Sequence, residues 1–296
     1  MFHKEAFIEF LQFERRTSEH TVTAYQNDIN QFIQFLDEIY EVDSIQEVNH
    51  QLVRSWLIHL LDDQSLSTSS VNRKLSALKT YFKFLRKNQI IDNNPLQKII
   101  APKKSKRLPE FVEQKSMDKL FDEVAFPNDF VGKRDELILE MLYLTGMRLS
   151  ELIGVKLDNI DAQQGFIKVL GKRNKERFIP VSSAFINKIE KYLAERQNLE
   201  QLVDSDYLFL TEKGKKIYSS LVYNIVKTNL NLVTTIKKKS PHVIRHTFAT
   251  HMLNNGADLN TIKEILGHAN LAATQVYTHN SFERIKSIYK QAHPRA

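Results

Sequence analysis

The first hundred residues carry apolar side chains at helical spacing, with no strand-like alternation. Amphipathic helices are predicted over 6–16, 18–40, 48–61 and 67–91. The clearest is 18–40, where the apolar positions recur at steps of three or four: Val22, Tyr25, Ile29, Phe32, Ile33 and Leu36. Ser18 is the expected N-cap of that helix. The pattern therefore predicts a compact helical bundle over residues 1–100.

A basic segment without periodicity follows the bundle. Pro95 precedes the stretch PKKSKR, which runs from Pro102 to Arg107. Prolines and charge without apolar periodicity are typical of an exposed connection between domains. Residues 101–109 are therefore predicted to be an interdomain linker, with the second domain covering residues 110–296.

The second region mixes both periods. RDELILEMLYLTG predicts a buried helix that stops at Gly146. Two β-rich runs, Phe166–Leu170 and Arg177–Val181, are joined by a basic turn and predict a hairpin. YLFLT, residues 207–211, is predicted to be another short strand, and the rest is helical. The fold class is thus mainly α, with an N-terminal helical bundle and an α+β domain holding a small antiparallel sheet.

Composition narrows the class of protein. The chain has 296 residues, and 42% of them are hydrophobic, which is enough to form two cores. No run of apolar residues is long enough to span a bilayer. No cysteine occurs, so disulfides, thiolate metal sites and a cysteine nucleophile are excluded, and a reducing cytoplasm is expected. The net charge of +7 favours a polyanionic partner, although basic clusters are also typical of solubilising loops.

The richest chemistry lies in SPHVIRHTFATHML, residues 240–253. Ser240 is the expected N-cap and Pro241 the first helical residue, which puts His242 and Arg245 beside free backbone N–H groups. Such a helix start suits an anion, most naturally a phosphate. A zinc site is disfavoured, because Arg245 stands where a metalloprotease would carry its catalytic Glu. His246 and His251 are better explained as core histidines.

Three other segments offer candidate partners for that phosphate. Arg148 follows a glycine-terminated helix and can be oriented by Glu151 three residues on, or the two can form a structural ion pair. Lys172 lies at the hairpin turn and is equally explained as a solvated turn lysine. His268 follows Gly267, and Tyr277 comes later in the same segment, where a packed core tyrosine is the alternative.

The ordered motifs TGMRLSEL, GKRNKERFIP, HVIRHTFATHML and LGHANLAATQVYTH resemble those of the tyrosine site-specific recombinases, the phage integrase family. Within it the chain is most similar to the Xer recombinases, and among them to the XerC group. The likeness covers nearly the whole chain and implies a SAM-like core-binding domain followed by a catalytic domain.

The resemblance also implies a site and its chemistry. Arg148 and Arg245 match the arginines that hold the scissile phosphate, and Lys172 matches the acid for the leaving 5′ oxygen. His242 and His268 match the positions beside the phosphate. Tyr277 matches the nucleophile that forms a 3′-phosphotyrosyl intermediate. No metal, ATP or other cofactor is expected.

Partners and alternatives follow from the same likeness. We expect double-stranded DNA with paired half-sites, bound by a tetramer that could include a paralogous recombinase, with control by a division-septum DNA translocase and no membrane insertion.

The segment FERIKSIYKQAHPRA, residues 282–296, predicts an amphipathic helix that docks into a neighbouring subunit or folds back on its own domain. If the helix docks, deleting the residues after Phe282 should weaken cooperative assembly on two half-sites but spare single-site binding. Chromosome dimer resolution at a dif-like site is the expected role, because no arm-binding domain is evident. A mobile-element integrase or invertase, a type IB topoisomerase-like enzyme and a non-catalytic DNA-binding regulator are the alternatives.

Overall fold

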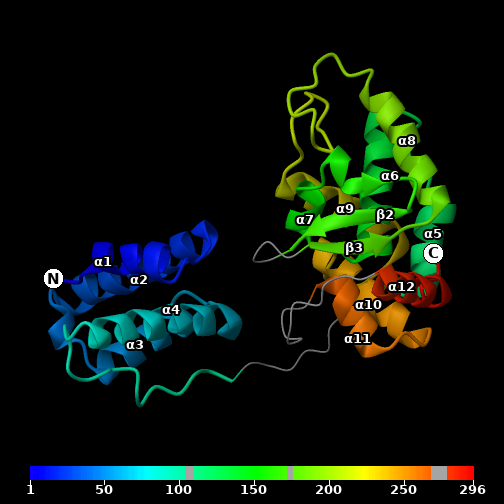
Figure 1. Ribbon diagram of the computed structural model, residues 1–296. Helices are drawn as coiled ribbons and strands as arrows, with labels where there is room; N and C mark the ends of the chain where they lie inside the picture. Colours follow the sequence, from blue (N-terminus) through cyan, green and yellow to red (C-terminus); the bar gives the residue numbers. More distant parts are fainter. Residues whose placement is uncertain (104–109, 172–175, 268–278) are drawn as a thin grey trace. The chain divides into compact units, whose positions relative to one another are not determined.

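A computed structural model describes residues 1–103, 110–171, 176–267 and 279–296. The chain divides into two compact units, Met1–Arg107 and Leu108–Ala296 (Figure 1). The fold class is as predicted: mainly helical, with one small antiparallel sheet in the second unit. Within the described residues, every helix is too short or too polar to cross a membrane.

The first unit is a helical bundle. Its elements are α1 Lys4–Glu9, the π-helical turn η1 Phe10–Glu14, α2 Glu19–Tyr40, the 3₁₀ turn η2 Ile45–Glu47, α3 His50–Asp62 and α4 Thr68–Lys87. The apolar faces of α2, α3 and α4 meet around Phe32, Trp56 and Phe82, all fully buried. Asn49 and Ser67 cap α3 and α4 through their side chains. Ser18 does occupy the N-cap position of α2, but its hydroxyl contacts that of Thr21 rather than a backbone N–H.

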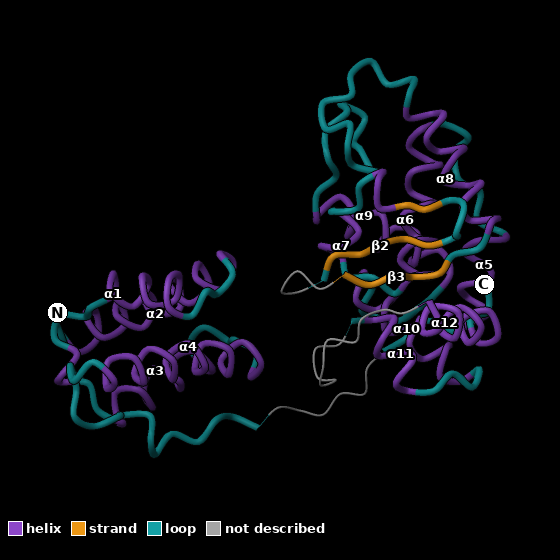
Figure 2. Tube along the Cα trace, viewed as in Figure 1, coloured by secondary structure: helices purple, strands orange, loops and turns teal. Residues whose placement is uncertain are grey.

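The second unit packs helices around the sheet (Figure 2). Its elements are α5 Gln114–Asp122, α6 Phe130–Thr145, α7 Leu149–Ile153, the 3₁₀ turn η3 Leu157–Asn159, β1 Ile160–Asp161, β2 Phe166–Leu170, β3 Glu176–Pro180, α8 Ser183–Arg196, α9 Ser219–Val233, α10 Pro241–Asn254, α11 Leu259–Leu266 and α12 His279–Ala292. The central helix α6 is buried almost throughout and contacts α8, α9 and α10.

The sheet confirms the predicted hairpin and adds one strand. β2 and β3 pair antiparallel, with Ile167 opposite Ile179, and both of these side chains are fully buried. Alternation along each strand therefore turns one face towards the core. The two-residue strand β1 pairs with β2 on its other side. Its shortness left no periodic signal in the sequence.

The strand predicted at YLFLT is wrong. Residues 207–211 make isolated bridges, Lys156 with Tyr207 and Leu210 with Lys216, rather than a ladder. Leu208 and Leu210 are buried, and their backbone N–H groups donate to the Val155 carbonyl and the Tyr192 hydroxyl. An unbroken apolar run is compatible with any buried extended segment. Here the run is a buried extended segment that pairs with no strand.

The last helix, α12, folds against its own unit. It contacts α10, α11 and β3, and buries Ile285, Tyr289 and Ala292. The Tyr289 hydroxyl donates to the Leu144 carbonyl at 3.1 Å, and His293 contacts the Tyr143 carbonyl at 3.2 Å. The chain itself thus covers the apolar face of this amphipathic helix. Deleting residues 283–296 would expose a core, so that deletion cannot test assembly alone, whereas docking into a neighbour stays a prediction.

Candidate active site

Arg148 lies between α6 and α7, where the local sequence ends one helix and starts the next. Gly146 ends α6 with φ +57°, a left-handed conformation that glycine adopts without cost. Arg148 then takes the N-cap position of α7. Its backbone N–H and one guanidinium nitrogen donate to the two carboxylate oxygens of Glu151, each at 2.7 Å. The side chain is 33% exposed, so the guanidinium is oriented from behind and open in front.

Arg245 enters from α10, whose start matches the prediction. Pro241 is the first helical residue, although Ser240 makes no capping bond through its side chain. The apolar stripe Ile244, Phe248 and Met252 is fully buried and fixes the rotation of the helix. This rotation turns Arg245 inward, where its side chain donates to the Gly146 carbonyl at 2.6 Å and the Leu266 carbonyl at 2.7 Å.

The two arginines meet at the end of α11. Arg148 donates to the Gly267 carbonyl at 3.2 Å, directly after the Leu266 carbonyl that Arg245 holds. Burial, together with the positive charge of Arg148, lowers the pKa of Arg245 to about 10. Arg245 therefore stays protonated at neutral pH as a poorly hydrated cation. An anion such as phosphate is the natural ligand for such a pair.

Arg177 joins these two arginines, and the sequence motifs alone assign it no role. It projects from β3, is buried, and donates to both carboxylate oxygens of Glu151 at 3.1 and 2.7 Å. A third bond runs to the Ile265 carbonyl at 2.7 Å. A signal was present in the sequence: Arg177 stands two residues before Ile179, so alternation puts both on the core face of the strand.

Glu151 is the carboxylate that balances this cluster among the described residues. Burial on its own would raise its pKa. Hydrogen bonds and charge from Arg177, with the backbone N–H and guanidinium of Arg148, outweigh burial and lower the pKa to about 2. Glu151 is therefore ionised throughout the physiological range. Three guanidinium groups around one carboxylate leave a net positive site.

The remaining predicted site residues divide into two groups. His242 is exposed in the first turn of α10, one turn ahead of Arg245. Lys172, His268 and Tyr277 lie outside the described residues; in the sequence Lys172 falls between β2 and β3, and His268 directly follows Gly267. The structure therefore brings Arg148 and Arg245 together, with His242 on the same helix as Arg245.

The histidine near the end of α10 belongs to the core rather than to this cluster. His251 is buried, and its Nδ1 contacts the Tyr143 hydroxyl at 2.8 Å. Burial lowers its pKa. His251 is a core histidine, as predicted, and His246 is half-buried. Within the described ranges no three His, Cys, Asp or Glu side chains gather as metal ligands would.

Comparison with known proteins assigns the family. Residues 110–284 match the model of the phage integrase family, and residues 5–89 match its N-terminal SAM-like domain. The chain belongs to the phage integrase family. It is 41% identical over 295 residues to the tyrosine recombinase XerC of Staphylococcus epidermidis, covering 99% of this chain and 97% of the relative. The XerC of Chlorobaculum parvum is 38% identical over 317 residues, covering 99% and 94%.

These relatives make the chain a Xer-type tyrosine recombinase, an enzyme that cuts and rejoins DNA at specific sites. Solved structures agree on the fold. The XerH recombinase bound to palindromic difH DNA superimposes with a TM-score of 0.73 at 21% identity, covering 97% of this chain and 94% of that one. The Tn1549 transposon integrase in complex with transposon right end DNA gives 0.75 at 18% identity, covering 96% and 98%.

Proposed function

We propose that this recombinase breaks DNA through a 3′-phosphotyrosyl intermediate in which Arg148 and Arg245 hold the scissile phosphate. The observation that carries the proposal is the convergence of these two arginines, from α7 and α10, on neighbouring carbonyls at the end of α11. Guanidinium groups held in advance need no reorganisation when negative charge develops on the phosphate. Removing one such donor typically slows the chemical step about 10²–10³-fold.

The proposed step balances without a cofactor. The Tyr277 phenolic oxygen attacks the scissile phosphorus while a neighbouring imidazole, that of His242 or His268, accepts the phenolic proton. The bond from phosphorus to the 5′ oxygen breaks, and Lys172 gives that oxygen a proton. His242 and His268 flank the phosphate and accept or donate hydrogen bonds as its charge grows. Rejoining reverses the step with a new 5′ hydroxyl, so the phosphotyrosyl link conserves the energy of the broken bond.

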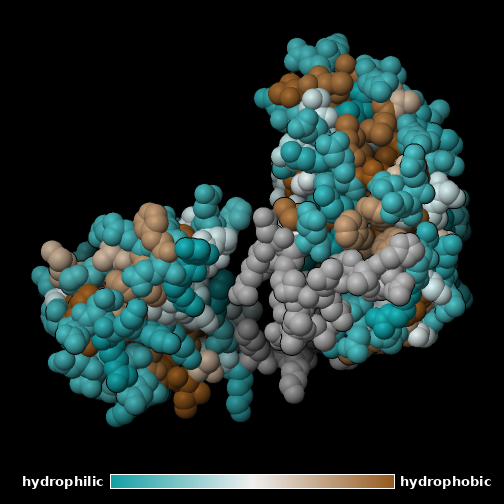
Figure 3. Space-filling model, viewed as in Figure 1, coloured by the Kyte–Doolittle hydropathy of each residue, from teal (hydrophilic) through white to brown (hydrophobic). Residues whose placement is uncertain are grey.

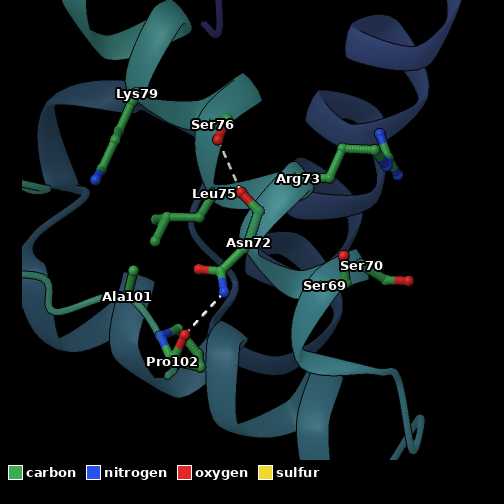
Figure 4. A pocket seen from close by; sticks show the side chains of 9 residues that line it. All are labelled: Ser69, Ser70, Asn72, Arg73, Leu75, Ser76, Lys79, Ala101 and Pro102. Carbon is green, nitrogen blue, oxygen red and sulfur yellow. Dashed lines mark hydrogen bonds between the residues drawn. The ribbon is translucent and has the colours of Figure 1, made fainter. Parts of the chain in front are cut away.

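We propose that the first unit also binds DNA, and one of its pockets supports this. A pocket of about 640 Å³ opens beside the first half of α4 (Figure 4). Lys79 lines it together with serine hydroxyls, and Asn72 closes one side by donating to the Pro102 carbonyl at 2.8 Å. The guanidinium of Arg73 pairs with Asp28 of α2. Cationic and hydroxyl groups beside a helix start are typical contacts for a DNA backbone. On the face seen in Figure 3, most side chains of each unit are hydrophilic.

The biological role we propose is resolution of chromosome dimers at a dif-like site. The full-length likeness to XerC proteins supports it. In this proposal four subunits assemble on two paired sites in the cytoplasm, with a paralogous recombinase as partner and a division-septum translocase as regulator. Deleting the gene should leave a fraction of dividing cells with unresolved chromosomes. A normal division phenotype would favour a mobile-element integrase or invertase instead.

The experiment for the chemistry uses a nicked duplex. The DNA carries the highest-affinity site that the purified protein selects from random sequence, with the nick beside the scissile phosphate so that the freed fragment diffuses away. A denaturing gel should show a protein–DNA adduct that Tyr277→Phe abolishes, while DNA affinity stays unchanged. Firm site-specific binding without an adduct would favour the non-catalytic regulator.

A further inference from the structure

Three arginines from three different elements hold three successive carbonyls at the end of α11. Arg177 of β3 donates to Ile265, Arg245 of α10 to Leu266, and Arg148 at the start of α7 to Gly267. The last carbonyls of a helix carry partial negative charge, so each contact is favourable. The guanidinium cluster therefore fixes the carbonyl end of α11.

Arg177 differs from the other two arginines in burial and in what it holds. Its side chain is 4% exposed, so it has no open face for a DNA phosphate. One edge of the guanidinium grips both oxygens of Glu151, and its Nε–H reaches the Ile265 carbonyl. Gly267 lies so close that an added Cβ would stand 3.2 Å from the Arg177 side chain. Each of the three guanidinium nitrogens thus makes a hydrogen bond inside the protein.

Glu151 links Arg177 to the proposed phosphate site. The same carboxylate holds Arg148 at 2.7 Å and Arg177 at 2.7 Å. If Arg177 were absent, Glu151 would be neutralised by Arg148 alone, and Arg148 would be drawn towards the carboxylate at the expense of the phosphate. The cluster would also fall from two net positive charges to one.

We propose that Arg177 is a positioning residue for DNA cleavage: it neutralises Glu151, which leaves the charge of Arg148 available to the phosphate, and it fixes the end of α11. This inference rests on the proposed function of Arg148 and Arg245. The lowered pKa of Glu151 agrees with it, since burial is opposed first by the hydrogen bonds and charge of Arg177. The role is indirect, because Arg177 acts through Glu151 and the Ile265 carbonyl.

The test compares adduct formation on the nicked duplex described above, in single-turnover reactions at saturating protein. Arg177→Met should slow cleavage on the order of 100-fold, the usual effect of a small misplacement at a reacting centre, with DNA affinity within about threefold of wild type. The double variant Arg177→Met with Glu151→Gln removes both charges. It should cleave at least about tenfold faster than Arg177→Met, since two net positive charges are restored.

The pH dependence gives a second readout. Without Arg177, the pKa of Glu151 rises, so lowering the pH protonates Glu151 and releases Arg148. The cleavage rate of Arg177→Met relative to wild type should therefore increase from pH 8 to pH 5, and the double variant should lack this trend. Arg177→Lys keeps one charge but cannot bond both Glu151 and the Ile265 carbonyl, so its rate should fall between those of wild type and Arg177→Met.

A matched control separates this role from folding. Arg196 is also buried and donates to the carbonyls of Ser205 and Tyr207, away from the arginine cluster. Arg196→Met should lower the unfolding temperature yet cleave within about twofold of wild type below it. A double variant no faster than Arg177→Met, or Arg177→Lys and Arg177→Met both cleaving like wild type, would overturn the positioning role. Wild-type protein that forms no adduct would instead overturn the proposed function and this inference with it.

Discussion

Substituting Gly146 by alanine tests whether the end of α6 is shaped to place Arg245. Gly146 has φ +57°, and an added Cβ would stand 2.5 Å from Phe248 and 2.8 Å from Leu266. Its carbonyl accepts the 2.6 Å bond from Arg245. The substitution therefore strains the backbone, crowds the core and displaces an arginine at once.

The expected cost follows from these three features. An L-residue in the left-handed region costs roughly 1–2 kcal/mol, and forcing extra atoms into a packed core costs about 1–3 kcal/mol. Gly146→Ala should thus lower the free energy of unfolding of the second unit by about 2–5 kcal/mol, a large share of the usual total. A shift of Arg245 by about 1 Å should slow adduct formation about 100-fold.

The assay can follow the two units separately. The chain has one tryptophan, Trp56, which is buried in the first unit. In urea, its fluorescence reports the first unit, while far-UV circular dichroism follows the helices of both. Gly146→Ala should move the circular dichroism transition of the second unit to lower urea and leave the tryptophan transition in place.

Gly256 provides the matched control. It also has a positive φ, +90°, but an added Cβ would meet nothing within 4 Å. Gly256→Ala should therefore carry the backbone strain without the crowding and cleave DNA like wild type. Equal losses of stability for the two variants, or unimpaired cleavage by Gly146→Ala, would refute the account of Gly146 as the residue that places Arg245.

Three further predictions concern binding, the last helix and pH. DNA affinity should fall steeply with salt, because most contacts are to phosphates, and an affinity independent of salt between 50 and 200 mM would contradict this. Deleting residues 283–296 removes the buried Tyr289 and should unfold the second unit, whereas deleting residues 294–296 should not. Circular dichroism that shows a folded second unit in the first variant, or an unfolded one in the second, would contradict this. Burial lowers the pKa of His293 to about 4, so the folded state favours the neutral imidazole. The free energy of unfolding is therefore highest above about pH 6.5 and declines as the pH falls towards 4, by about 3 kcal/mol in all. His293→Asn should flatten that decline in urea titrations, and an unchanged pH slope would rule His293 out as its source.

Local patterns predicted the fold where a single element carries its own signal. The helix 18–40 and the hairpin around 166–181 follow from apolar spacing and turn chemistry, and the structure has α2, β2 and β3 within a residue or two of those bounds. The prediction of a strand at 207–211 is wrong because surrounding helices, rather than a partner strand, bury this segment. The alternation of apolar and polar residues along a sequence does not report such tertiary packing.

The site shows the same division. Residue type and helix position identify Arg245 as an anion-binding candidate, and the pairing of Arg148 with Glu151 that the spacing predicts is present. The convergence of both on the end of α11 depends on long-range packing, which spacing along the chain cannot give. The sequence neighbours of Arg177 form a basic cluster typical of a solvated turn, whereas its burial depends on Glu151 and Ile265, which lie far from it in the sequence.

The most direct test of the central claim is to map the covalent link itself. Wild-type protein is trapped on the nicked duplex, digested with trypsin and nuclease, and the nucleotide-bearing peptide is sequenced by mass spectrometry. The account predicts a nucleotide attached through its 3′ phosphate to Tyr277, and a free 5′ hydroxyl on the released strand that polynucleotide kinase can label. A link to another residue, or a 5′-phosphoryl link, would contradict it.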